Sequence, residues 1–350
     1  MTTVFFAIPG DINLPTGGYT YDRRVLALLP QCGVTARHLK LPAGYPAPTA
    51  TDLDATARAF AETPKHSVLM VDGLAYGAMS TDIIKHTACP IIALVHHPLC
   101  LETGLTDPRA AELRASETAA LGLAMRVIVT SRTTAKTLID EFAVPPDKLT
   151  IAEPGTDPAP RVHGSSGALQ LLAVGSVVPR KGYDILVRAL EQVSATVPWE
   201  LTIAGATDRS PETTTALQAQ IWRSPLASRM RMIGGLSESA LADVYARSDV
   251  LVLSSLYEGY GMVLTEALAR GLPIVTTTGG AAAETVPDAS ALKVPPGDVD
   301  TLAQALERII MDAALRKQLS DAAWAFAQTS LPRWEDTTAT IASVIKELVR

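Results

Sequence analysis

The alternation of strand and helix is clearest in one stretch of the chain, which runs Asp249-Val250-Leu251-Val252-Leu253-Ser254-Ser255-Leu256-Tyr257-Glu258-Gly259-Tyr260-Gly261-Met262-Val263-Leu264-Thr265-Glu266-Ala267-Leu268-Ala269-Arg270-Gly271-Leu272-Pro273. Its apolar run, Val250–Leu253, predicts a buried strand. A glycine-rich turn follows, and the residues from Met262 predict a helix that ends at Gly271 and Pro273. Glu258 lies on the turn and Glu266 lies well into the helix.

A glycine turn that opens a helix behind a strand is typical of an anion site. Two glycines in three positions let a ligand approach the backbone N–H groups of Gly259, Tyr260 and Gly261 closely. The carboxylates of Glu258 and Glu266 do not bind phosphate, but they accept hydrogen bonds from sugar hydroxyls. The stretch therefore predicts a site for a nucleotide-sugar, with Glu258 at the sugar and Glu266 at the ribose.

The length and composition of the chain limit the alternatives. Its 350 residues favour two domains, and a hydrophobic content of 47% excludes a disordered chain. The net charge of −6 argues against a nucleic-acid partner and gives no support for binding to an anionic membrane surface. No apolar run has the length of a membrane span.

The cysteines and the first residues bear on the compartment. Cys32, Cys89 and Cys100 are widely spaced and odd in number, which predicts neither a disulfide framework nor a metal site. A reducing cytoplasm is the expected compartment. Met1–Pro9 has no basic segment before its short apolar run, so we expect a first strand there and not a signal peptide.

Alternating strands and helices predict two successive α/β layers with parallel sheets. The polar, proline-containing segment 150–167 is the expected boundary between residues 1–160 and 161–332, and Trp334–Val349 is an expected final helix within 333–350. The expected strands are Val4–Ile8, Val34–Leu39, Ser67–Val71, Ile91–Val95, Arg126–Thr130, Leu169–Val174, Leu201–Ala204, Met230–Ile233, Val250–Leu253 and Ile274–Thr276. The expected helices include Tyr19–Leu29, Asp52–Glu62, Tyr183–Ser194, Ser237–Ser248 and Asp300–Asp312.

A second site candidate follows the first strand of the second half and runs Gly175-Ser176-Val177-Val178-Pro179-Arg180-Lys181-Gly182. Ligands bind at this end of the strands in open parallel sheets. Arg180 and Lys181 would neutralise a diphosphate and stabilise it as a leaving group. A solvated basic turn is the alternative interpretation. The spacing does not fit the Walker A pattern, and neither half has a Gly-x-Gly-x-x-Gly after its first strand, which argues against a dehydrogenase.

The first half offers fewer site candidates. His96 and His97 follow the strand Ile91–Val95, and either could contact a ligand there. Gly17 and Gly18 would let the first loop approach a phosphate or an acceptor, or they simply turn the chain into a helix. Tyr21 and Arg24 lie on the following helix and could line an acceptor pocket. Glu102, Thr103 and Gly104 follow the histidines and could also face the cleft. Two Asp-x-Asp pairs, at 52–54 and 298–300, precede helices and are interpreted as caps.

The chain resembles the retaining glycosyltransferases of family 4, which have the GT-B fold of two facing Rossmann-like domains. The resemblance is strong over Gly175–Gly182, Gly235–Ser237, Glu258–Pro273 and Gly279–Glu284, and looser in the first half over Gly17-Gly18, Val95–Pro98, Ser131 and Pro154–Asp157. It implies an active site in the interdomain cleft, no metal and no cofactor. It also implies that the final helix crosses back to the first domain.

The same resemblance assigns roles to individual residues. The residues expected at the chemistry are His96, Arg180, Lys181 and Glu258. Those expected to bind the donor are Gly17, Gly18, His97, Gly175, Ser176, Arg180, Lys181, Leu236, Ser237, Glu258, Gly259, Tyr260, Gly261, Met262, Val263 and Glu266. His96 directly follows the strand and is the closer match to the family's sugar-binding histidine, although His97 remains open.

The expected activity is transfer of a sugar from a UDP- or GDP-sugar to a hydroxyl acceptor, with retention at the anomeric carbon. The acceptor is a small molecule, a glycan or a lipid-linked compound. Three alternatives stay open: a nucleotide-sugar epimerase, a glycoside phosphorylase, and a non-catalytic protein that binds a nucleotide or a sugar. The epimerase would need no acceptor, the phosphorylase would need inorganic phosphate, and the binding protein would release no nucleoside diphosphate.

Overall fold

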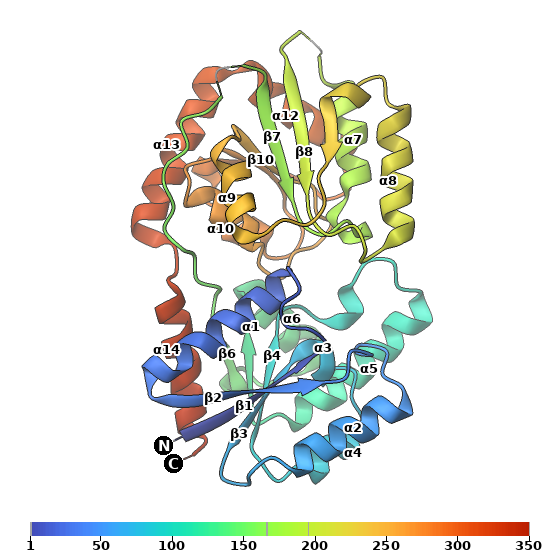
Figure 1. Ribbon diagram of the computed structural model, residues 1–350, viewed down its shortest axis with the longest axis vertical. Coiled ribbons are helices and arrows are strands. Elements are labelled where there is room, and N and C mark those ends of the chain that lie inside the picture. Colours follow the sequence, from blue (N-terminus) through green and yellow to red (C-terminus); the bar gives the residue numbers. More distant parts are fainter. Residues whose placement is uncertain (1, 166, 195, 350) are drawn as a thin grey trace. The chain divides into compact units, whose positions relative to one another are not determined.

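The computed structural model describes residues 2–165, 167–194 and 196–349, and its ribbon is shown in Figure 1. The chain forms two compact units. Unit 1 consists of Met1–Gly155 together with Pro332–Arg350, and unit 2 consists of Thr156–Leu331. The last helix of the chain is therefore part of the unit that the first half builds.

Unit 1 contains a six-stranded parallel sheet with the strand order β2-β1-β3-β4-β5-β6. Its strands are β1 (Thr2–Pro9), β2 (Val34–Leu41), β3 (Val68–Asp72), β4 (Ile91–Val95), β5 (Arg126–Val129) and β6 (Leu149–Ile151). Its helices are α1 (Gly17–Leu28), α2 (Ala50–Ala61), α3 (Gly73–Tyr76), α4 (Thr81–His86), α5 (Asp107–Leu123), α6 (Arg132–Phe142) and α14 (Trp334–Glu347).

The sheet of unit 1 is covered on both faces, which explains its apolar central strands. Every residue of β3 and β4 is buried, as expected for strands of a parallel sheet between two helical layers. The final helix α14 packs against α1 in this unit (Figure 1). Gly155 makes this packing possible, because a Cβ there would lie 2.2 Å from the backbone nitrogen of Trp334.

Unit 2 contains a second six-stranded parallel sheet with the order β12-β11-β10-β7-β8-β9. Its strands are β7 (Leu169–Val174), β8 (Trp199–Ala204), β9 (Met230–Met232), β10 (Val250–Leu253), β11 (Ile274–Thr277) and β12 (Ala291–Val294). Its helices are α7 (Tyr183–Gln192), α8 (Pro211–Arg223), α9 (Glu238–Ala246), α10 (Met262–Leu268), α11 (Ala282–Thr285), α12 (Val299–Met311) and α13 (Ala313–Ser330).

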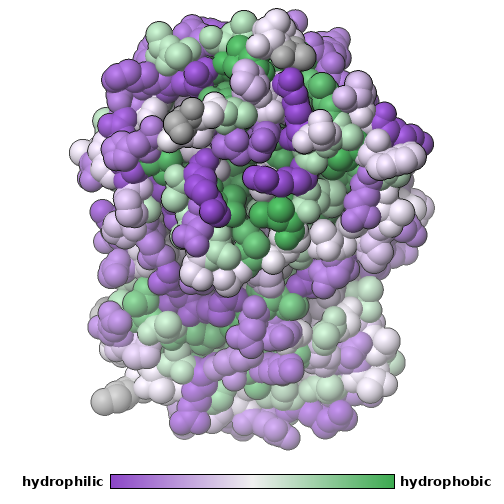
Figure 2. Space-filling model, turned by 45° about the horizontal axis from the view of Figure 1, so that its top comes forward, coloured by the Kyte–Doolittle hydropathy of each residue, from purple (hydrophilic) through white to green (hydrophobic). Residues whose placement is uncertain are grey.

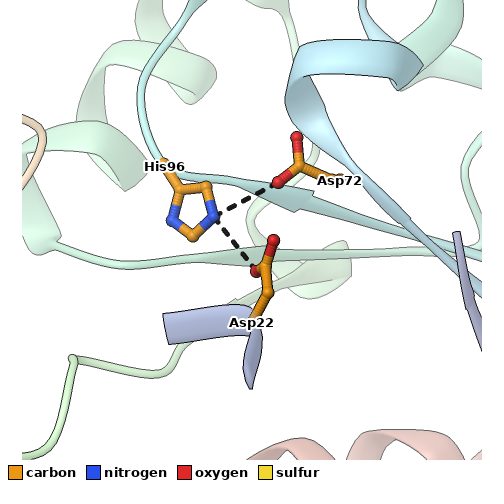
Figure 3. A group of neighbouring side chains, drawn as sticks. All are labelled: Asp22, Asp72 and His96. Carbon is orange, nitrogen blue, oxygen red and sulfur yellow. Dashed lines mark ion pairs between the residues drawn. The ribbon is translucent and has the colours of Figure 1, made fainter. Parts of the chain in front are cut away.

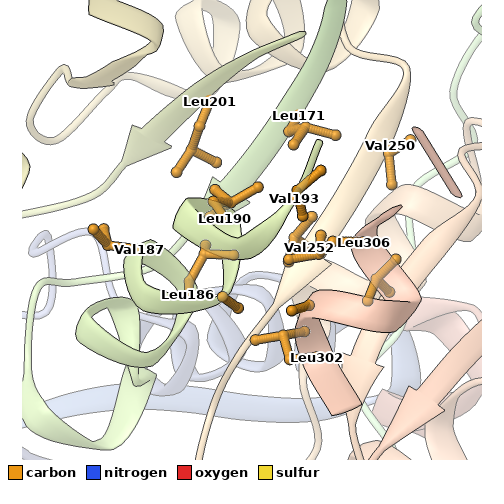
Figure 4. Packing of buried hydrophobic residues seen from close by; sticks show 14 of the residues in the cluster. Leu171, Leu186, Val187, Leu190, Val193, Leu201, Val250, Val252, Leu302 and Leu306 are labelled. Carbon is orange, nitrogen blue, oxygen red and sulfur yellow. The ribbon is translucent and has the colours of Figure 1, made fainter. Parts of the chain in front are cut away.

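The hydrophobic core of unit 2 fixes its helices to the sheet. On one face, leucines of α7 and α12 interlock with side chains of β7, β8 and β10 (Figure 4). Leu186, Leu190 and Leu306 are fully buried there. A second cluster covers the other face with residues of α10 and α13. Two clusters on opposite faces leave the loops at the strand ends as the places where polar side chains can gather.

Each sheet has one point at which the strand order reverses, so that the connections from the two strands beside it lead to opposite edges of the sheet. It lies between β1 and β3 in unit 1, and between β7 and β10 in unit 2. Crevices outside the carboxyl ends of strands at such points are the usual ligand sites of open α/β sheets. In unit 2 the loop with Arg180 and Lys181 follows β7, and the loop with Glu258 follows β10.

The two parallel sheets confirm the predicted α/β fold, and the differences lie at its edges. The strands β6 and β12 were not predicted, because each is a short edge strand of three or four residues. Asp52 was predicted to cap its helix, which is wrong. Thr49 is the cap, and Asp52 instead accepts a hydrogen bond from the Thr49 backbone at 2.8 Å in a capping box. Asp298 does cap α12.

The helix predicted from Met262 begins there but ends at Leu268, before Gly271. Gly271 then takes a left-handed conformation with φ of 66°. The backbone N–H of Leu272 donates to the Ala267 carbonyl at 3.0 Å, which closes the helix end as glycine usually allows.

Polar and apolar residues are intermixed on the face drawn in Figure 2, where the apolar ones form small groups between polar ones. Within the described ranges we find no helix with the length and apolar content needed to span a bilayer.

Candidate functional site

The loop after β7 is shaped by two glycines. Gly175 has φ of 145°, and a Cβ there would lie 2.7 Å from Cε of Lys181. Gly182 is left-handed with φ of 60°, and its Cβ would lie 2.4 Å from the carbonyl oxygen of Ser254. Side chains at these positions would strain the backbone and push the loops apart. The glycines therefore let the Lys181 side chain and the next loop pack closely.

Hydrogen bonds join this loop to the loop after β10. The Leu256 backbone N–H donates to the Arg180 carbonyl at 2.7 Å, and the Ser254 hydroxyl donates to the Lys181 carbonyl at 2.9 Å. The Glu258 backbone is held in turn by residues 279–281, through bonds to the Gly279 carbonyl and from the Ala281 N–H. Hydrogen bonds thus join three segments that are far apart in the sequence into one corner of unit 2.

Arg180, Lys181 and Glu258 form a charged cluster at this corner. Lys181 Nζ lies 2.6 Å from Glu258 Oε1, and Arg180 Nη1 lies 3.3 Å from Glu258 Oε2. The Ser255 hydroxyl donates to Oε1 at 2.5 Å, and Arg180 donates to the Tyr257 carbonyl at 2.7 Å. Two cations and one anion leave a net charge of +1. The sequence predicted the residues of this cluster but not that Glu258 pairs with both cations.

The cluster keeps Glu258 ionised although only 5% of the residue is exposed. Burial by itself would raise the pKa of this carboxyl group. Lys181 and then Arg180 oppose that effect, with help from hydrogen bonds, and the pKa of Glu258 falls to about 2. The group is a stable carboxylate at neutral pH, so it can accept hydrogen bonds but cannot supply a proton.

Glu266 lies on α10 and is bonded within unit 2. The Tyr245 hydroxyl donates to its Oε2 at 2.8 Å, and the Arg270 guanidinium lies over the Tyr245 ring, 4.4 Å from the centroid. Burial raises the pKa of Glu266, against the effects of Tyr245 and Arg270. These contacts fix the orientation of the carboxyl group, which is half-buried.

The remaining predicted donor-binding residues of unit 2 differ in what their side chains do. The Ser237 hydroxyl accepts from the Ala240 N–H and caps α9, while Leu236 and Val263 pack against the core. Tyr260 is buried, and Gly261 has φ of 90° at the start of α10. Gly175, Ser176, Gly259 and Met262 are partly exposed.

In unit 1 the histidine that follows β4 lies against the first turn of α1. That helix begins at Gly17, and Thr16 caps it by accepting from the Tyr19 N–H at 3.2 Å. A Cβ on Gly18 would lie 3.3 Å from Cδ2 of His96, so the glycine leaves room for the ring. The sequence predicted Gly17, Gly18 and His96 separately, and the structure brings Gly18 and His96 together.

Two buried aspartates face the same edge of the His96 ring (Figure 3). His96 Nε2 lies 3.3 Å from Asp22 Oδ1 and 3.5 Å from Asp72 Oδ2. Asp22 comes from α1, and Asp72 is the last residue of β3. Asp72 also accepts from the Leu74 N–H at 2.7 Å and so caps α3.

Charge pairing decides the protonation of this group. Burial acts to lower the pKa of His96, but the two carboxyl groups outweigh it and raise the pKa to about 10. Burial, with the neighbouring Asp72, raises the pKa of Asp22 to about 8. Burial also opposes ionisation of Asp72, yet its bonds to His96 lower its pKa. At neutral pH the group therefore holds a protonated His96 beside an ionised Asp72, while burial holds back the ionisation of Asp22.

His97 points to a different partner, since its Nε2 lies 3.3 Å from Glu102 Oε2. Glu102 also accepts from the Thr103 N–H at 3.2 Å. Tyr21 was expected to line an acceptor pocket, which is wrong: it is fully buried, and its hydroxyl donates to the Ala152 carbonyl at 2.9 Å. Arg24 lies over the Trp334 ring, 5.9 Å from the centroid.

Asp22 and Asp72 were missed in the sequence, although each leaves a signal. Asp22 falls beside Tyr21 and three positions before Val25, on the face of α1 that is buried. A carboxyl group on a buried helix face is unusual unless a partner accompanies it. Asp72 ends an otherwise apolar strand, at the edge of the sheet where polar side chains from several strands meet.

Part of the chain matches a known family model, and several known proteins are similar to it. Residues 158–325 match the model of the family described as glycosyl transferases group 1. The chain is 28% identical to the MMP alpha-(1->4)-mannosyltransferase of Mycolicibacterium hassiacum over 301 residues, which cover 80% of the chain and 70% of that relative. It is 27% identical over 213 residues to the D-inositol 3-phosphate glycosyltransferase of Stackebrandtia nassauensis, covering 55% of the chain and 48% of that protein.

Solved structures share the fold. The sucrose-phosphate synthase of Thermosynechococcus elongatus has a TM-score of 0.84 at 20% identity, with 99% of each chain covered. Anabaena HepE, solved in complex with UDP-glucose, has a TM-score of 0.75 at 17% identity, again with 99% of each covered. The matched family model describes glycosyltransferases, and both relatives named above are glycosyltransferases. This agreement confirms the enzyme class expected from the sequence.

Proposed function

We propose that this chain transfers a sugar from a nucleotide-diphosphate donor to a hydroxyl acceptor, with retention at the anomeric carbon. One observation carries the proposal: the buried cluster of Arg180, Lys181 and Glu258 at the point where the connections of the unit 2 sheet reverse direction. A site there with a net positive charge and a fixed carboxylate suits a ligand that combines phosphates with hydroxyls.

Unit 2 would hold the donor in this proposal. Arg180 and Lys181 bind the diphosphate, and Glu258 accepts from hydroxyls of the donor sugar. Glu266 accepts from the ribose, with its orientation set by the Tyr245 hydroxyl. Leu236 and Ser237 lie near the base. His96 of unit 1 donates to the sugar to be transferred, and His97 is the less favoured candidate because it pairs with Glu102.

The cluster would promote departure of the nucleoside diphosphate. Negative charge grows on the β-phosphate as the bond to the anomeric carbon breaks, and the buried Lys181 and the partly buried Arg180 stabilise that charge. Lys181 is only 9% exposed, so solvent screens it weakly. Glu258 holds both ammonium and guanidinium groups in place before the donor arrives, which limits the reorganisation that the transition state requires.

The state of Glu258 favours attack on the same face as departure. A double displacement would need a carboxylate nucleophile free to form a bond with the sugar. Both oxygens of Glu258 are engaged, Oε1 by Lys181 and Ser255 and Oε2 by Arg180. In the proposed step the acceptor oxygen bonds to the anomeric carbon, the bond to the phosphate oxygen breaks, and the departing phosphate takes the acceptor's proton.

The nature of the relatives suggests which substrates to try first. UDP-glucose is bound in the Anabaena structure, and a mannosyltransferase is among the relatives. UDP- and GDP-sugars are therefore the first donors to test. A phosphorylated polyol is one acceptor, because another relative acts on D-inositol 3-phosphate. Simple sugars and lipid-linked glycans complete the acceptor set. The free cysteines Cys32, Cys89 and Cys100 favour a cytoplasmic reaction.

An acceptor-dependent assay tests the proposal. The protein is incubated with each UDP- or GDP-sugar, with and without acceptors, while release of nucleoside diphosphate is measured and the product anomer is determined by NMR. We expect release that depends on an acceptor and a product with the donor's anomeric configuration. Epimerised donor without acceptor, sugar phosphate formed from inorganic phosphate, or an inverted product would contradict it. Tight binding without any diphosphate release would point to a non-catalytic protein.

A further inference from the structure

The first turns of α1 surround His96 with three kinds of contact. Gly18 lies against the ring at Cδ2 and Nε2, with distances of 3.3 and 3.4 Å from its ideal Cβ position. The rings of Tyr21 and His96 form a T-shaped pair, with a centroid separation of 5.3 Å and an interplanar angle of 83°. Asp22 faces Nε2 at 3.3 Å. One helix thus sets both the position and the rotation of the imidazole.

We propose that Asp22 is a positioning residue that, together with Asp72, holds His96 as an imidazolium in a single orientation. In that orientation Nε2–H faces inward and Nδ1–H is offered to the ligand. This inference deepens the proposed function, because it assigns the state in which His96 meets the donor sugar. It concerns the internal structure of unit 1 and can be tested without turnover.

The burial of Asp22 is the first argument. Its side chain is fully buried, and within the described residues neither carboxyl oxygen makes a hydrogen bond of good geometry. His96 Nε2 is also buried and makes no hydrogen bond of good geometry within the described residues. An isolated buried carboxyl group destabilises a fold by several kcal/mol, so these atoms must satisfy one another. A proton on Nε2, directed between Asp22 and Asp72, does this.

The orientation of the ring is the second argument. Nδ1 lies on the side of the ring away from both carboxyl groups (Figure 3). The His96 side chain is 22% exposed, whereas the aspartates are almost completely buried. The Thr130 hydroxyl donates to the His96 carbonyl at 3.1 Å and fixes the backbone from the β5 side. The ring therefore has one edge inside the fold and the other available to a ligand.

The ionisable surroundings are the third argument. The groups that face the ring are Asp22 and Tyr21 from α1 and Asp72 from β3, while His97 on the same loop pairs with Glu102. Burial raises the pKa of Tyr21 well above its ordinary value, so it stays neutral. Asp72 thus supplies negative charge at neutral pH, and Asp22 adds to it above its own pKa of about 8. Both carboxyl groups favour protonated His96, whose pKa of about 10 leaves Nδ1 a donor throughout the neutral range.

A protonated His96 has a definite role in the proposed transfer. It donates a hydrogen bond from Nδ1 to a hydroxyl of the donor sugar, and it cannot act as the base that takes the acceptor's proton. Charge-assisted hydrogen bonds of this kind are about twice as strong as neutral ones. This role agrees with a step in which the departing phosphate accepts that proton.

NMR of the protein with labelled histidine tests the positioning role directly. The chain has six histidines, and the His96→Gln variant identifies the signal of His96. We expect a protonated imidazole whose pKa lies far above 6.5, and a pKa that moves back toward 6.5 in Asp22→Asn. The control is Asp54→Asn, an exposed carboxyl on α2, which should leave the signal unchanged. A neutral His96 at pH 7 in the wild type, or the same pKa in Asp22→Asn, would overturn the inference.

The pH dependence of kcat/KM gives a readout that loss of stability alone would not move. In Asp22→Asn the alkaline fall in kcat/KM should shift to lower pH, giving roughly a tenfold loss at pH 8–9 relative to pH 6. Asp22→Glu should keep part of the wild-type pH profile. The control Asp54→Asn should have the same profile as the wild type. An Asp22→Asn profile parallel to the wild type would overturn the inference. If no donor turns over at all, the proposed function fails while the NMR result still decides the state of His96.

A cation is the remaining explanation for three buried ligand-type atoms within 4.8 Å of one another. The NMR titration is therefore repeated in EDTA and with ZnCl₂, MnCl₂ or MgCl₂ added. If the His96 signals do not change, the result supports a proton on Nε2 between Asp22 and Asp72. A metal-shifted Nε2 resonance with saturable binding, lost in Asp22→Asn, would overturn it in favour of a metal site.

Discussion

Lys181 is the single residue on which the proposed leaving-group chemistry depends most. Replacing it by alanine removes the ammonium 2.6 Å from Glu258 and leaves Arg180 as the only cation of the cluster. We expect kcat to fall by about 10²–10³-fold, the usual effect of removing one donor that stabilises developing negative charge. The measurement is diphosphate release under saturating donor.

The matched control is Lys317→Ala on α13, an exposed lysine of the same unit that also pairs with a carboxylate, Asp321. It should retain wild-type turnover. Circular dichroism and thermal unfolding establish that both variants are folded. Turnover close to that of the wild type in folded Lys181→Ala would remove the diphosphate role from this cluster.

Glu258 makes stability depend on acid pH. Its pKa is about 2 in the folded chain against an ordinary 4.5, so the unfolded chain binds its proton more readily. The stabilisation is complete above about pH 4.5 and is lost as the pH falls from there toward 2. Urea unfolding at pH 3 and pH 5 should show a smaller loss of unfolding free energy in Glu258→Gln than in the wild type. Equal losses would show that the carboxyl group is not held ionised.

Sequence reasoning at the residue scale was strongest where residue type and loop position agree. Arg180, Lys181 and Glu258 could be predicted to lie close together because loops after neighbouring strands carry them. That Glu258 pairs with both cations could not be predicted, because it depends on side-chain rotamers. Asp22 and Asp72 required knowing which helix face and which strand end adjoin His96, and those relations are tertiary.

At the scale of elements, the two loops of the cluster depend on Gly182. Alanine there would place its Cβ 2.4 Å from the Ser254 carbonyl oxygen and would strain a backbone with φ of 60°. We expect Gly182→Ala to lower the unfolding free energy by at least about 1 kcal/mol and to weaken donor binding. Chemical unfolding and a binding titration check the two effects.

Gly122→Ala on α5 is the control for that substitution, because a Cβ there meets no atom within 4 Å and φ is not left-handed. It should be neutral or slightly stabilising. A Gly182→Ala variant as stable as Gly122→Ala would mean that the close approach of the two loops is not required.

Helices and strands were predicted well where the segment is long and buried, and poorly where it is short and at the edge of a sheet. Ile91–Val95 and Val250–Leu253 are uninterrupted apolar runs in the middle of a sheet, and they were predicted with their observed bounds. The edge strands Leu149–Ile151 and Ala291–Val294 are too short to show a period. Prolines lie within three residues of both strands. The start of α2 was misplaced because Thr49 and Asp52 both suit a cap, and only the backbone conformation separates them.

At the scale of the whole molecule, the last helix stabilises the unit built by the first half of the chain. Trp334 at its start is 4% exposed and lies edge-on to Tyr21, with ring centroids 5.7 Å apart. We expect Trp334→Ala to lower the unfolding free energy of unit 1 by about 3–5 kcal/mol. Calorimetry should show one transition moved to lower temperature.

Trp222→Ala is the control for this prediction, since Trp222 is 80% exposed on α8 of unit 2. Its removal should change stability by less than about 0.5 kcal/mol. If Trp334→Ala unfolds like Trp222→Ala, then α14 does not contribute to the stability of unit 1.

The central claim is that the cluster at the turning point of the unit 2 sheet binds the diphosphate of a nucleotide-sugar. Calorimetric titration of UDP and GDP into the wild type, Lys181→Ala and Lys317→Ala tests it most directly, with uridine and guanosine as ligands that lack the phosphates. We predict that one of the two diphosphates binds the wild type and Lys317→Ala equally, and Lys181→Ala at least about tenfold more weakly, as loss of a charge-assisted contact implies. The corresponding nucleoside should bind all three proteins alike. Equal affinity of the diphosphate for Lys181→Ala and the wild type would contradict the claim.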